Sequence, residues 1–221
     1  MSDHVNAPRR YDGSRRRAAA ERTREAILAA ARDLFAEHGY TATSVQDVAA
    51  RAGVSVDTVY TTVGRKPRLL LAVHDMALAE GPAPLPAEQR DYVRAVRAAG
   101  SAEEMLRTYA TALGRLLPRT VPLALALREA GRTEPECAAQ YQALSDRRAA
   151  HMRLLAADLR ATGRLREDLG DDQVADLIWS LNSPEWFTLL AGRGYPPESY
   201  ADLLADVLQR TLLADRPQAK A

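Results

Sequence analysis

Residues 53–67 read GVSVDTVYTTVGRKP, and the conformation of this stretch decides the fold. Its middle is crowded with Val, Thr and Tyr, which favour β-strands. The chain around it is rich in Ala, Leu, Arg and Glu, which favour helices. A strand would need a partner strand, and the nearby sequence offers none. A helix places Val56, Val59 and Val63 on one apolar stripe with Ser55 as the N-cap, so we expect a short helix here.

The residues before this stretch predict two further helices. Apolar residues recur at helical intervals over 22–38, and Gly39 offers that helix a favoured stop. The sequence TSVQ at 43–46 has the form of a capping box, with Thr43 as the cap and Gln46 reaching back to its amide. A second, short helix should follow and end at the glycine that opens the quoted stretch. Two short helices joined by a glycine-containing turn outline a helix-turn-helix motif.

The outward face of the second short helix is suited to DNA. In this motif the second helix lies in the major groove. A threonine can hydrogen-bond to a base edge and its methyl group can touch a thymine methyl, while a tyrosine offers its hydroxyl to a phosphate. The residues outside the apolar stripe are Asp57, Thr58, Tyr60, Thr61 and Thr62.

The chain beyond this motif predicts helices throughout. Pro67 suits the first turn of a helix that ends before the sequence GPAPLP at 81–86. Pro118 is expected to end a helix, and Pro184 to kink or restart one. Glycine and proline breaks separate further helices, expected near 88–99, 102–117, 120–131, 135–163, 171–191 and 197–214. We therefore expect an all-α protein.

The pattern divides the chain into two domains and two tails. We expect an N-terminal three-helix DNA-binding domain at 21–80, which includes a linking helix at 66–80, and a larger C-terminal helical bundle at 86–214. Residues 1–20 are expected to form a disordered basic arm, and residues 215–221 a disordered tail. The first seventy residues hold 12 Lys and Arg against 8 Asp and Glu, whereas the whole chain has a net charge of +1. This basic excess fits nucleic-acid binding and, equally, a solvated tail.

Five motifs lie in register within residues 22–75: AILAAARDLFAEHGY, TSVQDVA, AGVS, TVY and KPRLL. Together they resemble the DNA-binding domain of TetR-type bacterial transcriptional repressors. Val63 and Arg65 depart from the commoner family pattern, which puts the phosphate contacts of that turn in doubt. Asp57 could accept from a cytosine amino group or simply cap its helix. The resemblance implies contacts to the DNA groove by Val56, Asp57, Thr58, Thr61 and Thr62, and contacts to phosphates by Thr43, Tyr60 and Lys66.

The same resemblance implies that the C-terminal domain receives a small-molecule effector and forms a homodimer. The last two predicted helices carry broad apolar surfaces, which could pair with a second copy or pack within one subunit. The candidates for the dimer interface are Ile178, Trp186, Leu203 and Val207. The candidates for effector binding are Tyr109, Arg128, Tyr141, His151, Trp179 and Trp186. An acidic ligand would favour Arg128 as its partner, and each tryptophan could instead be a core residue.

These features favour a ligand-responsive, homodimeric repressor that binds a pseudo-palindromic operator in double-stranded DNA. A ligand-independent regulator, or an activator of the same fold, stays open. An enzyme is disfavoured, because Cys137 and His151 would lie about 21 Å apart along one predicted helix. The histidines have no metal-ligand spacing, so neither a metal nor a cofactor is expected. The single cysteine, with no secretory signal and no long apolar span, indicates a cytoplasmic protein without a membrane segment.

Overall fold

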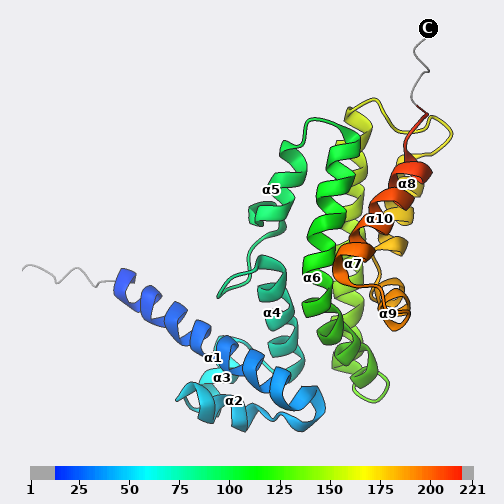
Figure 1. Cartoon of the computed structure of the whole chain (residues 1–221). Coiled ribbons are helices and arrows are strands. Elements are labelled where there is room, and N and C mark those ends of the chain that lie inside the picture. The colour runs from blue at the N-terminus through cyan, green and yellow to red at the C-terminus, as the bar shows by residue number, and fades with distance from the viewer. Residues whose placement is uncertain (1–12, 216–221) are drawn as a thin grey trace, which may run out of the picture.

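The computed structural model describes residues 13–215, and Figure 1 shows their helices arranged in two parts. The first three helices form a small unit, the later helices form a larger bundle, and α4 lies between them. Within the described residues there is no β-strand, and Leu165 and Leu213 form an isolated bridge. The predicted all-α class is therefore confirmed. The helices are α1 (Gly13–Ala42), α2 (Val45–Ala52), α3 (Val56–Thr62), α4 (Lys66–Ala79), the 3-10 turn η1 (Ala87–Gln89), α5 (Asp91–Ala98), α6 (Ala102–Ala130), α7 (Pro135–Ala161), α8 (Asp171–Leu181), α9 (Pro184–Gly192) and α10 (Pro197–Leu212).

A shared apolar core holds the small unit together. Ile27 and Leu28 of α1, Val48 of α2, Val59 of α3 and Leu69 of α4 are each at most 1% exposed. Burying an aliphatic side chain of this size stabilises a fold by roughly 1.5–3 kcal/mol. The core therefore fixes which face of α3 turns inward and which turns to solvent.

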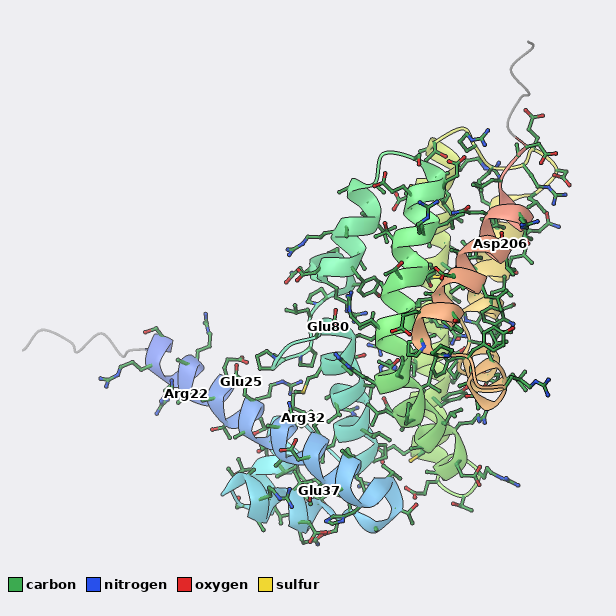
Figure 2. The ribbon with its side chains drawn as sticks, viewed as in Figure 1. Arg22, Glu25, Arg32, Glu37, Glu80 and Asp206 are labelled. Carbon is green, nitrogen blue, oxygen red and sulfur yellow. The ribbon has the colours of Figure 1, made fainter. Side chains whose placement is uncertain are left out.

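α1 begins earlier than the sequence predicts. The predicted disordered arm includes residues 13–20, but these form the first turns of α1. The reason is that arginine and alanine, which fill this segment, both have high helix propensity. Figure 1 shows this part of α1 extending beyond α2 and α3, and Figure 2 labels Arg22 on it. The remaining residues of the predicted arm and tail, 1–12 and 216–221, lie outside the described residues.

α6 runs unbroken through two prolines, which corrects the predicted break at Pro118. Each proline removes one backbone hydrogen bond from a helix. Pro118 and Pro122 both lie on the exposed side of α6 and leave its buried face intact. Gly114 lies one turn before Pro118 and lets α10 approach closely, because a Cβ there would lie 2.6 Å from the carbonyl oxygen of Pro197.

The larger bundle is built around α6. α5 and α10 pack on α6, while α7 packs against both α6 and α8. Leu106, Leu159, Ile178 and Leu204, from four different helices, are fully buried in one apolar core. Pro184 begins α9 immediately after α8 ends, so the predicted restart at this proline is confirmed.

α4 connects the two parts of the molecule. It packs on α1 and also on α6 and α7. Asp75 of α4 accepts hydrogen bonds from Arg147 of α7 at 2.9 and 3.0 Å. Glu80, which follows α4 and is labelled in Figure 2, accepts from Arg115 of α6 at 2.8 and 2.6 Å. A shift of α4 would therefore disturb both of these ion pairs.

Candidate functional site

Side-chain caps position the first short helix. The hydroxyl oxygen of Ser44 accepts from the backbone N–H of Asp47 at 3.1 Å, and the Asp47 carboxylate accepts from the Ser44 N–H at 2.9 Å. The predicted capping box of Thr43 and Gln46 is therefore wrong by one residue. Thr43 is 2% exposed, and its hydroxyl donates to the carbonyl oxygen of Gly39 at 2.8 Å. This burial makes Thr43 a support for the turn between α1 and α2, and not a surface contact.

A glycine turn and a serine cap position α3. Gly53 adopts the left-handed conformation, with φ of 67°, and ends α2. The Ser55 hydroxyl oxygen accepts from the backbone N–H of Thr58 at 3.1 Å, which confirms Ser55 as the N-cap. The capping role considered for Asp57 thus belongs to Ser55. Because Val59 is fully buried, the opposite face of α3 is turned outward.

The outward face of α3 carries hydroxyl groups. Tyr60 is 45% exposed, which makes it the most prominent large side chain of this helix. The Thr61 hydroxyl donates to the carbonyl oxygen of Asp57 at 2.8 Å, so its oxygen stays available as an acceptor. The residues predicted to face a DNA groove or phosphate from this helix are all exposed or partly exposed: Val56, Asp57, Thr58, Tyr60, Thr61 and Thr62.

Basic side chains flank this face. Arg24 of α1 donates to the carbonyl oxygen of Thr62 at 3.0 Å. The Arg65 side chain, just before α4, is 77% exposed. The Lys66 ammonium group lies 4.1 Å from the centre of the Tyr40 ring, and partial burial lowers the pKa of Lys66. Sequence reasoning did not assign Arg24 to the DNA-binding site, and it noted Arg65 only as a departure from the family pattern. The position of Arg65 beside the motif was visible in the sequence.

A cavity lies among α4, α6 and α7. The space between its wall atoms amounts to about 750 Å³ when the part that is open to solvent is included. Two residues predicted to bind an effector, Tyr109 and His151, line it. Desolvation and the neighbouring charges of Arg90 and Arg147 lower the pKa of His151, so its ring is neutral near pH 7.

The other four candidates for effector binding do not line this cavity. Arg128 and Tyr141 both donate to the carboxylate of Glu185 at the surface, at 2.6 and 3.0 Å. Trp179 and Trp186 pack against the edge of the bundle core. An ion pair and core packing therefore occupy these side chains, and the alternative interpretation of both tryptophans as core residues fits the structure.

Sequence reasoning missed most polar residues of the cavity wall, Arg148 and Asn182 among them. Arg148 is hard to single out in a chain with so many arginines. The available signal was its register on α7, because it precedes Met152 by four residues, and Leu155 and Leu159 continue the same helical face. All three of those apolar residues are buried. A charged residue on a buried helical face is the uncommon feature here.

The candidates for the dimer interface divide into two groups. Ile178 has no exposed surface, so a second copy cannot reach it and it is a core residue. Leu203, Val207 and Trp186 are partly exposed. α8 and α10 lie side by side at the edge of the bundle that is remote from α1–α3 (Figure 1).

The described residues form neither a cluster suited to a metal ion nor a membrane-spanning helix. Across 13–215, His, Cys, Asp and Glu side chains nowhere gather in a group of three or more that could hold a metal ion. None of the helices in that range combines the length and apolar character needed to cross a membrane.

Comparison with known sequences places the N-terminal unit in a family. Residues 27–73 match the family model described as bacterial regulatory proteins, tetR family. Over 55 residues the chain is 49% identical to the HTH-type transcriptional repressor Rv3405c of Mycobacterium tuberculosis, a match covering 25% of this chain and 29% of that protein. The match to this relative is therefore confined to less than a third of its length.

Two further comparisons extend over most of the chain. NalD of Pseudomonas aeruginosa, the secondary repressor of the MexAB-OprM multidrug efflux pump, shares the fold with a TM-score of 0.63 at 22% identity, covering 89% of this chain and 100% of that one. Over 183 residues the chain is 31% identical to YdeS of Bacillus subtilis, an uncharacterized HTH-type transcriptional regulator, covering 81% of this chain and 84% of that protein. The chain therefore belongs to the TetR family of bacterial transcriptional regulators and carries its helix-turn-helix DNA-binding domain.

Proposed function

We propose that this protein is a homodimeric, ligand-responsive repressor that reads a pseudo-palindromic operator through α3. The observation that carries the proposal is the outward face of α3, where hydroxyl groups stand exposed on a helix whose inner face is fixed by buried Val59. Repression is supported by two similar proteins, Rv3405c and NalD, both of which are named as repressors.

The proposed DNA contacts fall into two classes. Thr58, Thr61 and Thr62 read base edges in the major groove, because their short side chains carry hydroxyl oxygens that can hydrogen-bond to a base and methyl groups that can touch a thymine methyl. Tyr60 and Lys66 bind phosphates and set the position of α3. Arg24 and Arg65 add positive charge beside the same face, and the arginines at 15–17, near the start of α1, are exposed as well.

The proposed dimer uses α8 and α10, which would form a four-helix interface with the same helices of a second copy. Leu203 and Val207 supply apolar surface on α10, and Leu177 and Leu181 supply it on α8. Two α3 helices held in this way would meet two half-sites about one helical turn of DNA apart.

The proposed response to a ligand acts through α4. His74, Asp75 and Leu78 line the cavity, and the same helix begins with Lys66 beside the DNA-reading face. A ligand that fits the cavity better in one position of α4 than in another would favour that position. The two α3 helices of the dimer would then shift relative to each other. Such a ligand lowers the affinity for DNA by as much as the DNA lowers the affinity for the ligand.

Selection of binding sites from a random pool of duplex DNA tests the proposal. The full-length protein is expected to enrich an inverted repeat, and transcription from a promoter that contains this repeat is expected to fall when the protein is added. Enrichment of no sequence, or of a single unrepeated site, would contradict the proposal. Increased transcription would instead identify an activator.

A further inference from the structure

We propose that the cavity among α4, α6 and α7 takes an organic anion, a carboxylate carried on a largely apolar body, and that Arg148 binds its charge. This inference rests on the proposed function, because it names the chemical class of the effector that the regulator would bind. Binding of the anion can nevertheless be measured without DNA.

Arg148 is a cation with no carboxylate in direct contact, although the charge of Glu185, which pairs with Arg128, acts on it from farther away. It lines the cavity from α7, and within residues 13–215 it forms no ion pair. Its Nη2 donates over a long 3.4 Å to the carbonyl oxygen of Trp179, while its Nε is buried without any partner. Burial lowers the pKa of Arg148, yet a guanidinium stays protonated in proteins. A partly buried charge in this position is stabilised when an anion pairs with it.

A second unsatisfied atom, Asn182 Oδ1, lies on the same cavity wall. In the described part of the chain, the buried side-chain atoms without a hydrogen-bond partner are Arg148 Nε, Asn182 Oδ1 and the Tyr200 hydroxyl. Asn182 donates from Nδ2 to the Tyr109 hydroxyl, and Tyr109, Tyr200 and Arg148 are close enough to shift one another's pKa. Native proteins seldom leave such groups unpaired. Two of these three atoms, Arg148 Nε and Asn182 Oδ1, belong to residues that line the cavity, and together they indicate a place prepared for polar atoms of a ligand.

The charges around the cavity favour an anion over a cation. Arg90 is 6% exposed, donates to the carbonyl oxygen of Leu85 at 3.1 Å and forms no ion pair within the described range. The carboxylate of Asp75 is already matched by two hydrogen bonds from Arg147. Because His151 is neutral, unpaired positive charge dominates this wall, and an amine would be repelled.

The remainder of the wall calls for an apolar body. The aliphatic residues that line the cavity from the side of α6 and α7 are Leu113, Leu117, Val121, Ala124, Leu144 and Met152. These side chains form an apolar surface beside Arg148. An apolar ligand group that covers this surface would displace water from it, which is favourable. A carboxylate offers the planar pair of oxygens that a guanidinium fork binds. The wall therefore fits a hydrophobic acid better than a sugar phosphate or a free inorganic anion.

A purely structural role for Arg148 is the alternative. Its guanidinium carbon lies 5.0 Å from the centre of the Trp179 ring, a distance suited to a cation–π contact. That contact leaves Nε unsatisfied and does not account for Asn182 Oδ1. It does supply a probe, because an acid bound at Arg148 would change the fluorescence of Trp179.

The experiment measures thermal stability and tryptophan fluorescence of the full-length protein with matched acids and amines. The acids are decanoate, benzoate, phenylacetate and cinnamate, and the amines are decylamine, benzylamine, phenethylamine and cinnamylamine. Wild type, Arg148→Met, Arg148→Lys and the control Arg128→Met are compared. Arg128 is a matched control because it lies exposed on α6, outside the cavity, and pairs with Glu185.

At least one acid is expected to raise the Tm of the wild type by about 5 °C or more at saturation, and no matched amine is expected to do so. Arg128→Met should respond as the wild type does, Arg148→Lys should respond partly, and Arg148→Met should lose the response. Without ligand, Arg148→Met should melt no lower than the wild type, because it removes an unpaired buried charge. A shift that persists in Arg148→Met, a shift with amines alone, or no response to any acid would overturn the proposal.

The proposed function is tested separately, by measuring DNA binding with the same protein preparations. If the wild type binds a selected inverted repeat but no acid raises its Tm, the effector class is wrong and the regulator stands. If acids bind through Arg148 while no duplex is bound specifically, the anion site stands and the operator-reading function fails.

Discussion

At the scale of single residues, Thr61 and Lys66 lie close together but should influence DNA binding in different ways. Thr61 stands on the outward face of α3, where its hydroxyl would meet base edges in the proposed complex. Lys66 begins α4 and offers a charge near the same face. A charge acts on every phosphate backbone alike, whereas a base contact depends on the sequence.

Lys66→Gln should weaken binding to all duplexes by about tenfold and reduce the slope of log affinity against log salt by about 1. The reason is that one phosphate contact, with its released counterion, is lost. Titrations by fluorescence anisotropy at several salt concentrations measure both quantities. Arg210→Gln, on an exposed arginine of α10, is the control and should change neither. Unchanged affinity with altered sequence preference would show that Lys66 does not contact phosphate.

His151 should make the fold sensitive to mild acid. Its pKa in the folded protein lies below the ordinary value of 6.5, so the unfolded chain binds the proton more readily. The stability gained from a neutral His151 is present above about pH 6.5 and is lost as the pH falls below it.

His151→Gln should therefore lose less Tm than the wild type when the pH is lowered from about 7 to 5. Melting curves across this range make the comparison, with His38→Gln as the control at an exposed histidine. Arg90, Arg147, Glu88 and Asp75 are the charged groups that act on His151. Parallel pH curves for wild type and His151→Gln would contradict this account.

At the scale of helices, α4 is the element that both proposed sites share. It carries Lys66 at its start and His74, Asp75 and Leu78 at the cavity. Burial alone would raise the pKa of Asp75, but hydrogen bonds from His74 and Arg147 outweigh it and lower the pKa to about 2. The carboxylate therefore stabilises the folded state above about pH 4, and this contribution is lost as the pH falls toward 2.

Asp75→Asn should destabilise the protein at pH 7 by about 2 kcal/mol, because the charge that favours the folded state is removed. Denaturant unfolding measures the change, provided that the slope stays constant. Asp91→Asn breaks an ion pair at a side chain that is 87% exposed, and it should leave the unfolding midpoint almost unchanged. Equal effects of the two substitutions would show that the ion pair between α4 and α7 does not stabilise the fold.

The sequence predicts the helices of the DNA-binding unit well because their signals are local. The serine cap of α3, the valine stripe and Gly53 all act within a few residues of one another. The continuity of α6 through Pro118 depends instead on solvent exposure, which no local pattern reveals. The place of Arg148 likewise depends on how α4, α6 and α7 meet.

At the scale of the whole molecule, the proposed reading of an operator requires two copies of the chain. One α3 helix reads too few base pairs for a specific operator, and a two-fold symmetric pair reads an inverted repeat. The edge formed by α8 and α10 lies away from the DNA-reading unit, so pairing there leaves both α3 helices free to meet DNA (Figure 1).

The double substitution Leu203→Glu with Val207→Glu should give a monomer, because it places like charges in the apolar centre of the proposed interface. Sedimentation velocity measures the change in mass. Leu85→Glu, at an exposed leucine before α5, is the control and should remain dimeric. A double variant that stays dimeric would place the interface elsewhere on the molecule.

The most direct test of the central claim is the affinity of the full-length protein for one selected inverted repeat, compared with the same duplex in which one half-site is scrambled. We expect two subunits to bind the intact repeat and the scrambled duplex to bind about a hundredfold more weakly. Equal affinity for the two duplexes, with a single subunit bound to each, would contradict the proposal that a dimer reads an operator through two copies of α3.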